Sequence, residues 1–148
     1  MIKEKILNNL KDIVIIQDSD GSYKLFNRYC ITKTTDEFTV TVNTSYTTHS
    51  FSTLRNATIW CVADKRNQIY AANRIRDLDR KLGSLDADIN VYSNLIKRNK
   101  KIDDKLIFLT KLDEARSRKN DLTAELNGYV ISSKIWQTKQ FQKPNILH

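Results

Sequence analysis

The stretch from Ile75 to Ile96 constrains the fold more than any other part of the chain. Its apolar residues recur at alternating intervals of three and four positions, namely Ile75, Leu78, Leu82, Leu85, Ile89, Tyr92 and Ile96. This heptad pattern is typical of a helix whose apolar seam is covered by a partner helix. The segment that follows repeats the spacing through Phe108, Leu112, Ala115, Lys119, Leu122, Leu126 and Tyr129, and Leu106 and Leu109 are expected to widen its stripe.

A short polar linker, residues 97–101, joins the two segments and suits the turn of an antiparallel helical hairpin. Asp103 is expected to cap the second helix. Lys119 is the charged residue within the second seam. We expect its aliphatic stem to pack in the seam while its ammonium group reaches Asp79 or Asp86. In the alternative interpretation, Lys119 disfavours wrong registers or parallel self-association.

The part of the chain before the hairpin predicts a small α+β unit. Residues 2–11 carry apolar side chains at helical spacing and predict a short amphipathic helix. The segments 13–17, 23–33 and 38–42 are apolar, aromatic or alternating and predict strands, with a fourth at 46–51. Because turn-forming residues separate these segments, we expect an antiparallel meander.

A helix that covers this sheet is predicted to begin at Leu54, with Ser52 or Thr53 as its N-cap. No Pro or Gly interrupts the chain from Thr53 to Lys81, so the sequence allows this helix to continue into the long seam. We predict an α+β fold with a small domain over residues 1–63, a helical hairpin over 64–128 and a C-terminal segment over 129–148 that packs back.

The net charge indicates which classes of partner the protein could bind, and the cysteines indicate its cellular compartment. The net charge is +8, and most of the surplus of Lys and Arg follows residue 63. Such a surplus attracts nucleic acid, anionic membranes or acidic proteins. Cys30 and Cys61 are far apart and indicate reduced thiols of an intracellular protein. Since the apolar run Ile13–Ile16 is too short for a signal peptide or a membrane span, we expect a cytoplasmic protein without membrane contact.

The sequence motifs that indicate catalysis or metal binding are incomplete or absent in this sequence. Asp18–Gly21 opens like a calcium loop, but Tyr23 and Tyr29 stand where that loop needs Gly and Glu. His49 and His148 are distant from each other, which disfavours a zinc site. The sequence also lacks a Gly-flanked nucleophile and a Gly-rich phosphate loop. We expect a non-enzymatic protein without cofactor, metal or small-molecule substrate.

Basic residues gather at the expected hairpin tip, where the candidates for nucleic-acid contact are Lys97, Arg98, Lys100, Lys101 and Lys105. A protruding basic tip could contact phosphates without reading sequence. The alternative is that the tips and outer faces of coiled coils are ordinarily charged. Aspartates on the same helices, such as Asp103 and Asp104, interrupt the positive field and weaken the nucleic-acid interpretation.

Aromatic side chains on the expected sheet could form a second surface that binds nucleic acid. Tyr23, Phe26, Tyr29 and Phe38 could stack RNA bases on an exposed sheet face. Packing against the covering helix is the favoured interpretation, because large aromatic side chains dominate small cores.

Three stretches resemble small uncharacterised proteins of T4-like marine phages. They are FSTLRNATIWC at residues 51–61, LNGY at 126–129 and KIWQT at 134–138. The resemblance implies expression inside an infected bacterium, and it supplies no activity and no functional residues.

These observations favour a structural or protein-interaction module, a phage accessory protein whose hairpin docks a protein partner or another copy. The alternative is a nucleic-acid-binding accessory protein that contacts phosphates through the basic tip. A third interpretation, an enzyme inhibitor or host-takeover factor, would also act by surface binding.

Overall fold

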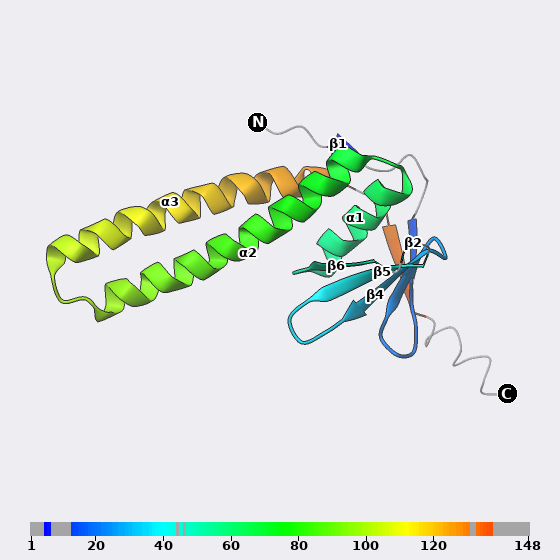
Figure 1. The fold of residues 1–148 in the computed structure, drawn as a ribbon, viewed down its shortest axis with the longest axis horizontal. Helices are drawn as coiled ribbons and strands as arrows, with labels where there is room; N and C mark the ends of the chain where they lie inside the picture. The colour runs from blue at the N-terminus through cyan, green and yellow to red at the C-terminus, as the bar shows by residue number, and fades with distance from the viewer. Residues whose placement is uncertain (1–4, 7–12, 44, 46, 131–132, 138–148) are drawn as a thin grey trace.

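The computed structural model describes residues 5–6, 13–43, 45, 47–130 and 133–137. It shows an α+β protein in which a helical hairpin projects from a body of sheet and helix (Figure 1), as the sequence predicts. The elements in chain order are β1 (Lys5–Ile6), β2 (Ile13–Gln17), β3 (Tyr23–Leu25), β4 (Tyr29–Lys33), β5 (Phe38–Val42), β6 (Thr48–Phe51), α1 (Leu54–Lys65), α2 (Ile69–Arg98), α3 (Ile102–Asn127), β7 (Tyr129–Val130) and β8 (Ser133–Gln137).

The main sheet contains the predicted antiparallel meander, with the strand order β6-β5-β4-β3-β2. β8 pairs with the other side of β2 as a parallel strand, so that Ile13 lies opposite Ser133. β1 and β7 form a separate parallel pair. Within the segment 129–148 that was predicted to pack back, residues 133–137 form strand β8 of this sheet, and residues 138–148 lie outside the described part.

The predicted N-terminal helix over residues 2–11 is wrong where the structure describes this segment. Lys5–Ile6 form strand β1, and the rest of the predicted helix lies outside the described residues. Apolar spacing over so few positions suits a helix and a strand alike. Pairing with Tyr129–Val130, which is remote in sequence, decides between them.

The predicted single strand over residues 23–33 is divided into β3 and β4 by a tight turn. Phe26 and Asn27 both have positive φ, 57° and 54°. The amide of Arg28 donates to the carbonyl of Leu25 at 3.0 Å and closes the turn. Two central residues with positive φ match the right-handed twist of a hairpin, and Asn tolerates this conformation well. The turn was missed because it contains no Gly.

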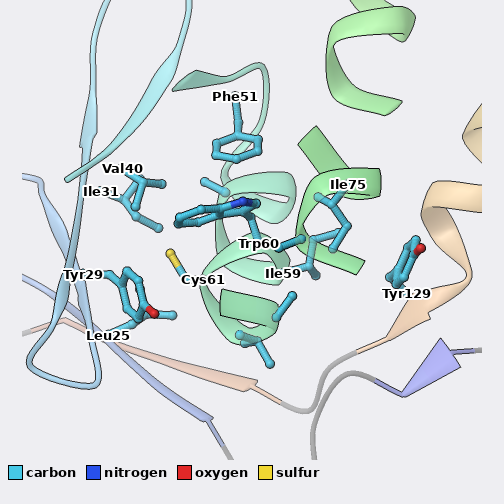
Figure 2. Close-up of a cluster of buried hydrophobic side chains, with 14 of the residues drawn as sticks. Leu25, Tyr29, Ile31, Val40, Phe51, Ile59, Trp60, Cys61, Ile75 and Tyr129 are labelled. Carbon is cyan, nitrogen blue, oxygen red and sulfur yellow. The ribbon is translucent and has the colours of Figure 1, made fainter. Parts of the chain in front are cut away.

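Helix α1 forms the centre of the hydrophobic core. Every residue from Asn56 to Ala63 is buried. Figure 2 shows Ile31 and Val40 of the sheet on one side of α1 and Ile75 of α2 on the other. A helix that is covered on all sides has no polar face, which explains why its sequence lacks an amphipathic stripe.

α1 does not continue into α2, although the sequence allows it. Asn67 adopts the left-handed conformation, with φ 57°. Its amide donates to the carbonyl of Asp64 at 3.0 Å, and the amide of Gln68 donates to the carbonyl of Ala63 at 2.9 Å. These two bonds form a Schellman motif with Asn in the place of the usual Gly. The chain therefore turns sharply, and α2 begins at Ile69.

The predicted hairpin is confirmed, because α2 and α3 pack along each other and are joined by residues 99–101 (Figure 1). Burial along the seam is uneven. The buried seam residues are Ile75, Leu78, Leu112, Ala115, Leu122, Leu126 and Tyr129. On α2, the seam residues from Leu82 to Ile96 are only half-buried. The base of the hairpin belongs to the core of the body, so the core runs across the predicted boundary between residues 63 and 64.

Ion pairs between α2 and α3 define the register of the hairpin. At the base, the Arg74 guanidinium binds both carboxylate oxygens of Glu125, at 2.6 and 2.7 Å. Further out, the Lys119 ammonium lies 2.7 Å from Asp86. The prediction that Lys119 reaches a facing aspartate is confirmed, and Asp86 is the aspartate it reaches. Its half-exposed position fits a stem packed on the seam and a solvated charge.

Replacing Ala115 with Phe should test the packing of the seam. In the register that these ion pairs define, Ala115 lies opposite Leu85, and a Phe at this buried position overpacks the layer. We expect the free energy of unfolding to fall by about 1–3 kcal/mol in denaturant titration. Ser117→Phe, on the exposed side of α3, is the matched control and should change stability far less. Equal effects of the two variants would contradict this register.

Candidate functional site

The five basic residues predicted as a nucleic-acid contact come together at the hairpin tip. Lys97 and Arg98 lie in the last turn of α2, Lys100 and Lys101 lie in the loop, and Lys105 lies near the start of α3. The first four are exposed, and Lys105 is half-buried. Cations in the last turn of a helix also interact favourably with its dipole, so Lys97 and Arg98 have a structural role without any ligand.

Carboxylates lie among these cations. The prediction that Asp103 is the N-cap of the second helix is wrong, because α3 begins at Ile102, with Lys101 at the N-cap position and no side-chain cap bond. Asp103 and Asp104 occupy the first turn, where their charges complement the helix dipole. The tip is therefore a surface of mixed charge.

Exposed apolar side chains adjoin the tip along α3. Ile102, Leu106 and Leu109 are 74%, 56% and 41% exposed. Successive helical residues turn by about 100°, so the spacing of four and then three places these residues on one face, away from the seam. We call these three residues the distal stripe. The prediction that Leu106 and Leu109 widen the seam is wrong, and their angle around the helix would have revealed it.

A polar depression between β6 and α2 is the second candidate site. Its volume is about 390 Å³, and its lining residues are Ser50, Asn73, Arg76, Asp77, Asp79 and Arg80. Asp77 accepts ion pairs from Arg74, Arg80 and Lys81 at 3.1, 2.8 and 3.0 Å. The bond with Lys81 and then that with Arg80 hold the pKa of Asp77 below its usual value. Much of the charge in this depression is thus compensated locally.

Asp79 is buried in this depression and caps the first turn of α1. Its carboxylate accepts from the Ser52 amide at 3.0 Å, from the Ser52 hydroxyl at 2.7 Å and from the Asn56 side-chain amide at 2.7 Å. The side chain of Thr53 caps the same helix through the amide of Asn56, as the sequence predicts. Because its oxygens are engaged in this way, Asp79 is a structural group. The expectation that it could pair with Lys119 is not met.

His49 lies beside the depression and is held neutral. Its ring packs against Trp60 at a tilt, with 4.4 Å between the ring centroids. The Arg76 guanidinium lies 2.9 Å from His49 Nδ1, and since a guanidinium can only donate, Nδ1 is the acceptor. Burial, and then the charge of Arg76, lower the pKa of His49. His49 therefore anchors Arg76 against β6.

The aromatic residues of the sheet belong to the core. Tyr29 is fully buried and donates a hydrogen bond to Asp64 of α1. Tyr23, Phe26 and Phe38 are half-buried and pack against the core cluster. The interpretation of these residues as packing groups is confirmed, and they form no open stacking platform.

Metal ligands and membrane spans are not found among the residues that the structure describes. No three or more His, Cys, Asp or Glu side chains come together there to hold a metal ion. None of the described helices is both long and apolar enough to cross a membrane. His148 lies outside this part. Comparison with protein-family models, with curated proteins and with solved structures gives no match for the chain.

The cap formed by Asp79 should be tested with Asp79→Ala. This change leaves buried donors of Ser52 and Asn56 without their acceptor and removes a charge from the N-terminus of α1. We expect the free energy of unfolding to fall by about 2–4 kcal/mol in denaturant titration. Asp88→Ala, at an exposed position of α2, is the matched control and should stay within about 0.5 kcal/mol of the wild type. Equal losses would show that Asp79 is not a cap.

Proposed function

We propose that this chain is a non-enzymatic interaction module that docks a protein partner or another copy of itself through the distal stripe of the hairpin. The observation that carries this proposal is the exposure of Ile102, Leu106 and Leu109 on one helix face. Single exposed apolar residues are common on proteins, whereas a contiguous row rimmed by charges is typical of an interaction site.

The position of the stripe supports this function. It lies on a hairpin that projects well beyond the body (Figure 1), so a partner can reach it without meeting the sheet. The base of the hairpin is fixed by the buried seam and by the Arg74–Glu125 pair. A rigid base presents the distal residues in a defined direction, which lowers the entropic cost of binding. The resemblance of the sequence to phage proteins favours an accessory role in an infected cell.

Leu106→Asp tests the docking function. A carboxylate in the centre of the stripe removes apolar contact area and must be desolvated on binding. We expect the variant to fold normally, because Leu106 is exposed, and to lose proteins that the wild-type chain retains from nuclease-treated cell extract. Lys111→Asp, at another exposed position of α3, is the matched control and should retain them. Identical sets of retained proteins for both variants would contradict the proposal.

Binding of nucleic-acid phosphates through the tip is the second candidate function. The exposure of Lys97, Arg98, Lys100 and Lys101 favours it. Apolar side chains beside the cations argue against it, because the distal stripe offers no aromatic ring for base stacking and no group for a phosphate.

Replacing these four basic residues with Ser separates the two functions. For phosphate binding, the affinity for duplex DNA should fall and its salt dependence should flatten, with a slope that decreases by about 0.9 for each lost phosphate contact. For protein docking, the same variant should fold normally and keep its partner. If the wild-type chain is not retained on DNA or RNA at low salt, the second function is excluded.

A further inference from the structure

Strand β6 is an edge of the main sheet, and no described strand pairs with its outer side. The amide of Val42 donates to the carbonyl of Thr47 at 3.4 Å, which fixes the phase of the ladder between β5 and β6. In an antiparallel ladder the amide and carbonyl of one residue point to the same side, and successive residues alternate between the two sides. The backbone groups of His49 therefore point toward β5, and those of Thr48 and Ser50 point outward.

The hydrogen bond of Ser52 to α2 agrees with this alternation. The Ser52 amide, two residues after Ser50, also points outward and donates to the Asp79 carboxylate at 3.0 Å. Asp79 thus occupies the place of a carbonyl on a further strand. Ser50 and Asp79 both line the polar depression, so the outward amide and carbonyl of Ser50 face it. No other backbone group of the described residues pairs with them.

Arg76 brings a positive charge to this edge. His49 Nδ1 accepts one of its hydrogen bonds at 2.9 Å, and the His49 ring is held against Trp60. Arg76 is otherwise exposed, and a guanidinium has several further N–H donors. Within the described residues, no ion pair joins Arg76 to a carboxylate. Its position is therefore fixed while most of its donors are accessible.

The two carboxylates that line the depression are already bound. Asp77 is shared by three cations of α2. Asp79 accepts hydrogen bonds from Ser52 and Asn56. The charge of Arg76 is thus the one in this lining that a ligand can neutralise.

We infer that an extended acidic segment of a partner protein adds to the outer edge of β6 as a further strand, with one of its carboxylates on Arg76. This site lies on the body and goes beyond the docking proposed for the distal stripe. The depression, at about 390 Å³, is within the ~300–1,000 Å³ usual for ligand sites. A residue opposite Ser50 would point its side chain away from the core, and its neighbours would point toward Arg76.

The groups at this edge favour a peptide over other occupants. The outward carbonyls of Thr48 and Ser50 need hydrogen-bond donors, which a peptide backbone supplies and a nucleic-acid phosphate does not. A second copy of β6 could pair with the edge, but its sequence, THSF, contains no carboxylate for Arg76.

A synthetic peptide tests strand addition. The probe is an acetylated and amidated hexapeptide in which Glu and Thr alternate, because this places its carboxylates on one face of an extended chain. We expect the wild type to bind it in calorimetry. Replacing Glu with Gln, or methylating the Thr amides that would pair with β6, should weaken binding by about tenfold or more. No binding of the probe, or equal affinity for either analogue, would overturn the inference.

Two pairs of protein variants test the site with the same probe. Ser50→Pro removes the outward amide but no ladder bond to β5, and Ser50→Ala is its matched control because it keeps the amide. Arg76→Gln removes the charge, and Arg118→Gln removes one from an exposed position of α3. We expect the first member of each pair to weaken binding by about tenfold or more and the second to bind as the wild type does. Equal affinities within either pair would overturn the inference. If Ser50→Pro does not fold, the N-methylated peptide still decides.

Hydrogen exchange locates the bound peptide. In the free chain the amides of Thr48 and Ser50 should exchange quickly, whereas that of Ser52 is protected by Asp79. We expect the probe to slow exchange of the first two amides by about tenfold or more. Unchanged exchange at saturating probe would overturn the inference. Protection that rises with the concentration of the wild-type chain alone would show a second copy at this edge and would also overturn it.

Discussion

The burial of α1 on all sides is the constraint on which the rest of the structure depends. The sheet covers one side of this helix and α2 covers the other (Figure 2). Its N-terminus is capped by Asp79 of α2. Arg55, at its start, donates to the carbonyl of Tyr129 at 2.6 Å, just after the end of α3. Because one short helix is joined in this way to both helices of the hairpin, the hairpin is mounted on the body in a defined orientation.

The burial of apolar side chains that stabilises the hairpin decreases from its base to its tip. Ile75 and Leu78 are fully buried at the base, whereas Tyr92 and Ile96, the seam residues of α2 near the tip, are only half-buried. Local opening costs least where few apolar groups are buried, so the distal turns are the least stable part of the hairpin by themselves. A partner that covers the distal stripe would therefore both bury apolar surface and stabilise these turns. This links the energetics of the hairpin to its proposed function.

Whether a feature could be predicted from the sequence depended on whether neighbouring residues or residues far along the chain determine it. The heptad seam, the meander and the Thr53 cap are encoded in neighbouring residues, and they were predicted correctly. Strand β1 depends on pairing with β7, which lies far along the chain, and local apolar spacing led to the wrong helix. The end of α1 was local but depended on Asn67, which took the left-handed conformation usually given to Gly.

The candidate site was predicted only in part, for a related reason. The basic tip follows directly from residues 97–105, and the structure brings these residues together. The sequence predicts Leu106 and Leu109 as seam residues because they are apolar and close to Phe108. Apolar character does not distinguish a covered face from an exposed one. The angle around α3 does, and it separates the distal stripe from the seam.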